Sequence, residues 1–133
     1  GRGDETTKFS VDGIRWHRTG DAGYLDDAGR LWLLRRCRGR IDDDCGTLYP
    51  FAVECAAQYH AAIRRAALVR WEGDRLLILE PENFADPPDL NPLMATLAWA
   101  QIDDVRLWRK IPVDKRHNAK IDYPALERLL TLE

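Results

Sequence analysis

The stretch AALVRWEGDRLLIL, residues 66–79, predicts two strands of a sheet that are joined by a tight turn. Apolar residues dominate on both sides of the polar triplet Glu72-Gly73-Asp74, and a glycine in such a triplet is typical of a hairpin turn. These two strands are the centre around which the rest of the chain can be arranged.

Helical and strand patterns flank this hairpin on both sides. The remaining elements are a helix at residues 51–60 after Pro50, a helix capped by Asp89 that carries Leu93, Leu97 and Ala100, a strand at residues 105–108, and a helix that begins near Pro124 and carries Leu126, Leu129 and Leu130. The order helix, strand, strand, helix, strand, helix predicts an α+β fold, a small mixed sheet covered by helices.

A second hairpin is expected nearer the N-terminus. The first ten residues are polar and glycine-rich and predict a loop or a frayed entry. Residues 23–25 and 30–34 then flank the turn-forming sequence Asp-Asp-Ala-Gly, and the second of these strands is so apolar that it should pack inside something larger. Charged residues replace the apolar pattern at residues 35–44, which marks a boundary between two parts.

Composition excludes several functional classes. The chain has 133 residues, of which 45% are hydrophobic, and a formal net charge of -2, so charge favours neither nucleic acid nor an anionic membrane as a partner. Three cysteines without CxxC spacing indicate neither a disulfide framework nor a zinc site, and no metal ligands are predicted. No apolar run of 18 residues and no signal peptide is present, so no membrane span and a cytoplasmic location are expected.

Taken alone, the polar residues that stand out have ordinary explanations. The triplet Thr19-Gly20-Asp21 before a strand is typical of a turn with a capping aspartate. Lys120 lies in a polar loop where most lysines are solvated, and a lone His117 is more typical of a hydrogen-bonded loop residue than of a ligand or base.

The basic run and the tryptophans also have structural explanations. The run holds four arginines and could form a nucleic-acid stripe, but three aspartates follow it at once, which favours a solvated, self-neutralising face. Its arginines are Arg35, Arg36, Arg38 and Arg40. The five tryptophans have large apolar neighbours and indicate packing in the core or between domains.

Three motifs occur together in an order that resembles a known family. Residues 16–30, WHRTGDAGYLDDAGR, resemble the W-x-R-T-G-D-x-G-Y-x-D-x-D-G-R motif of the adenylate-forming enzymes, which include acyl-CoA synthetases, aryl ligases and peptide-synthetase adenylation domains. Arg35-Arg36 resembles the G-R at their hinge. Residues 112–122 resemble their P-x-x-x-x-G-K-I-D stretch if two inserted residues are allowed before Ala119-Lys120.

The resemblance implies roles for particular residues. Thr19, Gly20 and Asp21 would bind the nucleotide, with the Asp21 carboxylate accepting hydrogen bonds from the ribose hydroxyls of ATP or AMP. Arg36 would reach the same nucleotide. Lys120 would be the catalytic lysine that stabilises charge while a carboxylic acid substrate attacks the α-phosphate.

The resemblance also implies two domains and an incomplete active site. Residues 1–38 would be the tail of a large N-terminal domain, and residues 39–133 a C-terminal lid that rotates about a hinge at Arg38. The phosphate loop, the acid pocket and the magnesium ligands of the family are missing, so the chain is expected to be inactive alone. The acid, CoA or an acyl carrier protein would then be partners of the complete enzyme, with fatty acid metabolism as its setting.

Two departures from the family pattern leave alternatives open. The K-x-R-G type of loop that contacts the pantetheine arm of CoA is replaced here by residues 41–46, IDDDCG. The sequence RHNAK at residues 116–120 resembles the β-lactone synthetases of bacterial olefin biosynthesis, which need no CoA. A third alternative, from another class, is a non-catalytic module that docks on a carrier protein or on a separate large domain.

Overall fold

The computed structural model describes residues 8–36, 39–116 and 120–133, with residues 34–36 described by their backbone. In chain order the elements are β1 (Lys8–Val11), β2 (Ile14–His17), β3 (Asp21–Leu25), β4 (Leu31–Arg36), β5 (Ile41–Asp43), β6 (Gly46–Leu48), α1 (Pro50–Gln58), β7 (Ile63–Trp71), β8 (Asp74–Pro81), α2 (Asn91–Thr96), η1 (Ala98–Ala100), β9 (Asp104–Leu107) and α3 (Tyr123–Leu132).

The central sheet has the strand order β7-β8-β9. β7 and β8 are antiparallel and form the predicted hairpin, in which Glu72 and Gly73 both take positive φ. β9 returns parallel to β8 after the long connection through α2, so the sheet is mixed, as the sequence predicts. β7 is left as an edge strand.

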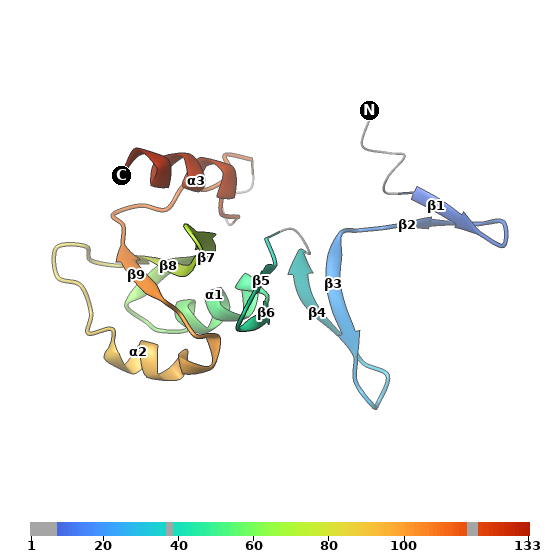
Figure 1. Ribbon diagram of the computed structural model, residues 1–133, viewed down its shortest axis with the longest axis horizontal. Helices are drawn as coiled ribbons and strands as arrows, with labels where there is room; N and C mark the ends of the chain where they lie inside the picture. The colour runs from blue at the N-terminus through green and yellow to red at the C-terminus, as the bar shows by residue number, and fades with distance from the viewer. Residues whose placement is uncertain (1–7, 37–38, 117–119) are drawn as a thin grey trace.

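Both faces of this sheet are buried, each by a separate apolar cluster. One face, covered by α1, α2 and the β5–β6 hairpin, takes Ala66, Leu68, Leu77 and Leu79. The opposite face, covered by α3, takes Ala67, Val69, Leu76 and Ile78. Figure 1 shows α3 on one side of the sheet and α1 and α2 on the other. Because successive strand residues point to opposite faces, the continuous apolar runs of residues 66–69 and 76–79 supply both clusters.

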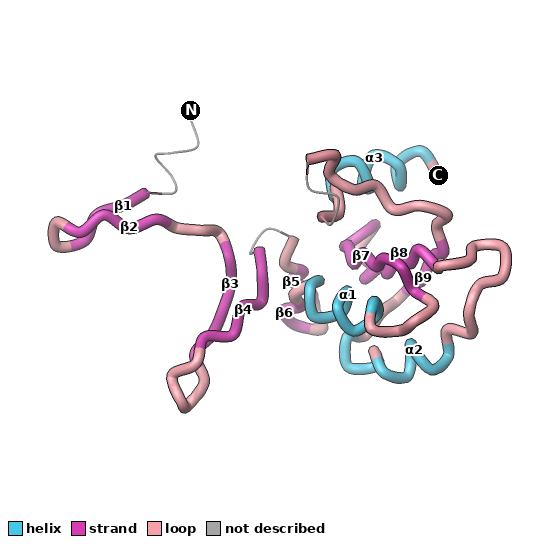
Figure 2. The backbone as a smooth tube through the Cα atoms, turned by 180° about the vertical axis from the view of Figure 1, so that it is seen from behind, coloured by secondary structure: helices cyan, strands magenta, loops and turns pink. Residues whose placement is uncertain are grey.

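The two N-terminal hairpins project away from this α+β region (Figures 1 and 2). The β3–β4 hairpin confirms the sequence prediction. Its apolar side chains are largely exposed in this chain, with Leu25, Leu31 and Leu33 each more than 60% accessible. The expectation that this strand packs inside something larger is therefore not met by the chain's own described residues.

Three expectations are corrected by the structure. Residues 8–10 are not a loop, because the Asp12-Gly13 pair, with φ of 51° and 78°, turns β1 into β2 and sets Phe9 opposite Trp16. The charged stretch after the boundary contains the unpredicted β5–β6 hairpin. The helix after Asp89 ends at Thr96 and continues as a 3₁₀ turn, with Leu90 rather than Asp89 at the N-cap position.

The self-neutralising interpretation of the basic run is correct for one pair and wrong for another. Arg40 Nε lies 2.8 Å from Asp42 Oδ2, and both side chains are about half exposed. Asp43, in contrast, forms a two-pronged ion pair with Arg75, whose side chain is 4% accessible. The hairpin folds Asp43 inward, so this aspartate is an anchor and not a solvated charge.

No helix in the described part of the chain is long and apolar enough to span a membrane.

Candidate functional site

The β3–β4 hairpin brings two of the predicted nucleotide-binding residues together. Asp21 is the first residue of β3, and its Cα partner across the ladder is Arg36, the last residue of β4. The two positions are fifteen residues apart in sequence, so only the hairpin makes them neighbours.

A β-bulge fixes which arginine faces Asp21. Gly23 pairs with Leu33, whereas Ala22 pairs with Arg35, so β4 carries one extra residue between these two pairs. Without that extra residue, the register would set Arg35 opposite Asp21. Gly23 also permits a close approach at this point, because a Cβ built there would lie 2.9 Å from the backbone oxygen of Trp32.

The Thr19-Gly20-Asp21 loop is shaped by a local hydrogen bond and by the conformation of its glycine. The Asp21 N–H donates to Thr19 Oγ1 over 3.2 Å, and Gly20 takes a φ of +78°, a conformation that favours glycine. Thr19 and Asp21 are exposed and Gly20 is half-buried. The loop therefore presents the Asp21 side chain at the end of the hairpin that also carries Arg36.

Asp26 organises the other end of the same hairpin, a role that the sequence did not single out. Its Oδ2 accepts from Trp32 Nε1 and from Arg30 Nε, each over 2.8 Å, and its Oδ1 accepts from the N–H groups of Ala28 and Arg30. The Trp32 hydrogen bond is the largest cause that lowers the pKa of this carboxyl below its ordinary value. In the sequence, the spacing between Asp26 and Trp32 across a glycine-containing turn was the signal that could have revealed this role.

Lys120 lies at the base of a different loop, between β9 and α3. Its carbonyl accepts from the Asp114 N–H over 2.9 Å, Val113 pairs with Ile121 in an isolated bridge, and the Asp122 N–H donates to the Pro112 carbonyl over 3.0 Å. These contacts close the loop like a short hairpin and leave the Lys120 side chain exposed. Residues 117–119, including His117, lie outside the described residues, as does the predicted hinge residue Arg38.

The described residues do not bring all predicted site residues into one place. Asp21 begins β3, whereas Lys120 lies between β9 and α3. Within the described ranges, no group of three or more histidine, cysteine, aspartate or glutamate residues could hold a metal ion. The predicted site residues thus lie in two separate places, one on the β3–β4 hairpin and one on the loop before α3.

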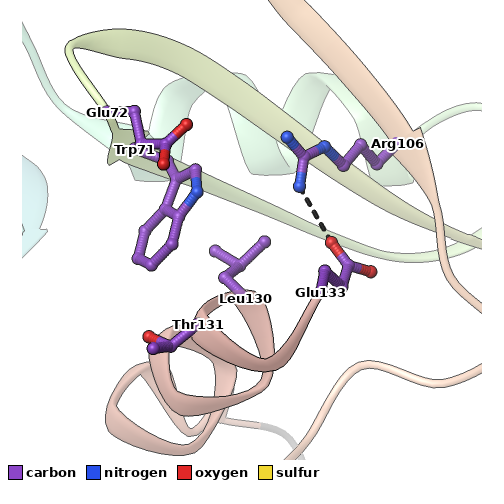
Figure 3. Close-up of a pocket in the computed structure, with 6 residues that line it drawn as sticks. All are labelled: Trp71, Glu72, Arg106, Leu130, Thr131 and Glu133. Atoms are coloured by element: carbon purple, nitrogen blue, oxygen red, sulfur yellow. Dashed lines mark hydrogen bonds and ion pairs between the residues drawn. The ribbon is translucent and has the colours of Figure 1, made fainter.

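A shallow groove of about 360 Å³ lies elsewhere, between the β7–β8 turn, β9 and the end of α3 (Figure 3). Trp71, Glu72, Leu130 and Thr131 line it together with an ion pair in which Arg106 Nη1 lies 2.8 Å from Glu133 Oε2. Arg106 also pairs with Asp104. Since none of the predicted site residues lines this groove and its cation is already paired, the groove does not form part of the candidate site.

Known ligases are similar to this chain in sequence and in fold. An olefin β-lactone synthetase of Xanthomonas campestris is 35% identical over 124 residues, a match that covers 79% of this chain and 21% of that protein. The amide bond synthetase of Marinactinospora thermotolerans superposes with a TM-score of 0.70 at 26% identity, covering 90% of this chain and 26% of that one. In both sequence and fold, the chain is therefore similar to part of the adenylate-forming ligase superfamily.

A third comparison concerns the fold alone. The O-succinylbenzoate coenzyme A synthetase of Bacillus subtilis, in a complex with ATP and magnesium ion, has a TM-score of 0.68 at 22% identity over 85% of this chain and 24% of that one. No protein-family model matches the chain. The chain spans about a fifth of the length of the curated relatives it matches.

Proposed function

We propose that this chain is the C-terminal portion of an AMP-forming ligase that activates a carboxylic acid with ATP. The observation that carries the proposal is the bulged register that sets Asp21 opposite Arg36. A carboxylate and a guanidinium at the same end of one hairpin offer an acceptor for ribose hydroxyls and a permanent cation for ribose or phosphate oxygens. The fold is shared with a coenzyme A synthetase that was solved in complex with ATP and magnesium ion.

In this proposal the chain supplies positioning and charge. Thr19 and Gly20 shape the loop that presents Asp21 to the ribose, while Arg36 binds the nucleotide from the facing strand. An oxygen of the substrate carboxylate attacks the α-phosphorus, the bond from that phosphorus to the bridging oxygen breaks, and pyrophosphate leaves. The Lys120 ammonium stabilises the negative charge that gathers on the phosphate and carboxylate oxygens.

The domain division follows from the same proposal. Residues 1–38 form the tail of a large domain and residues 39–133 form a lid, with Arg38 as the hinge that turns Lys120 toward or away from the nucleotide. Exposed apolar side chains on the two N-terminal hairpins support this division, because such surface is ordinarily covered. Those side chains include Phe9, Val11, Ile14, Trp16, Tyr24, Leu25, Leu31, Trp32 and Leu33.

Magnesium would be held outside this chain. The described residues offer oxygen ligands on the Asp21 loop but no cluster of three. When bound, the ion would neutralise negative charge on the phosphates of the nucleotide. That the substrate is a fatty acid and that the protein is cytoplasmic remain predictions from the sequence.

A second candidate concerns what happens to the acyl-adenylate. The match to a β-lactone synthetase favours ring closure by the substrate's own hydroxyl, with release of AMP. The β5–β6 hairpin fits this candidate, since Asp44 is exposed there and would repel the phosphates of CoA. Thioester formation with CoA or with an acyl carrier protein is the competing outcome.

The test uses the full-length protein that contains this sequence and measures acid-dependent exchange of pyrophosphate into ATP. Lys120→Ala should lower the exchange rate about 10²- to 10³-fold with little change in nucleotide affinity, because it removes a charge that acts mainly in the transition state. Asp21→Ala should instead raise the KM for ATP. Lys110→Ala, another exposed lysine, is the matched control.

The acceptor is then identified from the product. AMP release with a β-hydroxy acid alone supports the lactone reaction, whereas a requirement for CoA or a carrier protein supports thioester formation. Tight carrier binding without any pyrophosphate exchange would contradict the ligase proposal and favour the docking module.

A further inference from the structure

Glu54 occupies a junction between three elements. It lies on α1, and its Oε1 accepts from the backbone N–H of Leu68 over 3.1 Å on β7, the edge strand of the sheet. The same carboxylate oxygen accepts a hydrogen bond from the Tyr123 hydroxyl, at the first residue of α3. α1 and α3 cover opposite faces of the sheet (Figure 1). Through its bonds to Leu68 on β7 and to Tyr123 on α3, Glu54 therefore joins the two layers.

Tyr123 continues directly from the loop that carries Lys120. Only Ile121 and Asp122 separate the two residues, and Ile121 and Tyr123 both pack against the apolar cluster beneath α3. The Asp122 N–H donates to the Pro112 carbonyl and closes the loop. Asp122 Oδ1 accepts from the Ala125 N–H over 3.0 Å and caps α3. A shift of the Tyr123 ring would therefore move the base of the loop.

The other end of the loop is held by a second carboxylate. Glu80, on β8, is 3% accessible, and its Oε2 accepts from the Ile111 N–H over 2.7 Å. Its Oε1 accepts from Arg65 Nη1 over 2.9 Å. The entry of the Lys120 loop is thus fixed to the middle of the sheet, while its exit is fixed to the edge of the sheet through Glu54.

We propose that the Glu54–Tyr123 hydrogen bond positions the Lys120 loop for adenylation, so that Glu54 and Tyr123 are positioning residues for the catalytic lysine. This inference rests on the proposed function. A flexible lysine on an exposed loop gains transition-state charge stabilisation only if its backbone is held, because a displacement of about 1 Å can cost about 100-fold in rate. The bond spans 69 residues of sequence, so it forms only when both layers are packed on the sheet.

The first measurement is made on this chain and needs no activity. Tyr123→Phe removes the hydroxyl and keeps the ring in the apolar cluster. Amide hydrogen exchange, followed by NMR, should quicken about 5-fold at Asp114 and Asp122, whose N–H groups close the loop. The backbone N–H of Trp108 donates to the Leu79 carbonyl in the core sheet, and its exchange rate reports on global stability. This rate should be unchanged.

The second measurement is made on the full-length enzyme. Tyr123→Phe should lower the kcat of pyrophosphate exchange about 10- to 100-fold and leave the KM for ATP near the wild-type value. Glu54→Gln, which keeps an oxygen acceptor, should retain more activity than Glu54→Ala. Tyr59→Phe is the matched control, since it removes a hydroxyl from a tyrosine that is 93% accessible at the end of α1.

The outcomes separate this inference from the proposed function. If wild-type enzyme exchanges pyrophosphate and Tyr123→Phe does so at the same kcat, the positioning inference is overturned while the ligase proposal stands. Faster amide hydrogen exchange at the Trp108 backbone N–H as well as at the loop amides would also overturn it, because Tyr123→Phe would then have a global effect on stability. If wild-type enzyme exchanges no pyrophosphate, the ligase proposal fails, and the catalytic role of the pair fails with it.

Discussion

Single aspartates differ in what they do in this chain, although the sequence presents them alike. Asp21 lies exposed at the end of a hairpin, Asp26 ties the turn at the other end, and Asp43 points inward onto Arg75. The difference comes from the donors around each carboxylate. Asp26 and Asp43 accept from donors that the fold holds in place, and these hydrogen bonds lower the pKa of both carboxyls.

The Asp26 network predicts a pH-dependent change in the β3–β4 hairpin. Because the pKa of the folded Asp26 carboxyl is lowered, its stabilising effect is fully present above the unfolded pKa and is lost as the pH falls through the lowered, folded value. The Trp32 indole N–H resonance should therefore shift only in acid, below the ordinary aspartate value of 3.8. Asp26→Asn should abolish that titration. An indole shift centred at or above the ordinary value would contradict the assignment.

Among the elements, the β5–β6 hairpin depends most on distant contacts. Arg75 Nε and Nη2 each lie 2.7 Å from an Asp43 oxygen, Nη2 also donates to the Gly46 carbonyl, and Nη1 donates to the Ala100 carbonyl. The Arg75 side chain thus joins the β5–β6 hairpin to β8 and to the 3₁₀ turn that follows α2. The sequence predicted β7, β8 and α1 because their apolar spacing is local, and it missed this hairpin because its partner lies 32 residues away.

Removing Arg75 should therefore destabilise the domain strongly. Arg75→Met leaves the Asp43 carboxylate without its cation and two carbonyls without donors, which should lower the free energy of unfolding by about 3–5 kcal/mol. Urea unfolding measures this change. Arg40→Met, which breaks the exposed pair with Asp42, is the control and should leave the unfolding midpoint almost unchanged. A small effect of Arg75→Met would show that the hairpin is not anchored through this side chain.

At the scale of the whole molecule, the described residues form an α+β region, whose sheet is covered on both faces, and two N-terminal hairpins. The α+β region leaves the apolar side chains of these hairpins exposed. The region has its own apolar clusters on both faces of the sheet, which suits a lid that moves as one body in the proposed function. The β3–β4 hairpin carries Asp21 and Arg36, two of the residues that the sequence predicted to bind a nucleotide. The hinge proposed between the two parts and the joint action of Asp21 and Lys120 stay predictions.

The cluster beneath α3 should contribute a large share of the stability of this region. Leu126 is fully buried there, so Leu126→Ala should lower the free energy of unfolding by about 2–5 kcal/mol. Leu129→Ala, on the same helix but 43% exposed, should change it by less than about 0.5 kcal/mol. Chemical denaturation of the two variants checks the difference. Equal losses would mean that α3 does not pack on the sheet through Leu126.

The sequence by itself determined the strands and helices of the sheet region, because apolar periodicity and turn residues act over a few positions. It also determined the motifs around Asp21 and Lys120 that resemble the ligase superfamily. Only the tertiary structure decided that a bulge sets Arg36 opposite Asp21, that Asp43 is buried against Arg75, and that Glu54 on α1 bonds Tyr123 on α3. Strand register and long-range polar contacts are set by how packed elements meet, and no local pattern in the chain encodes that meeting.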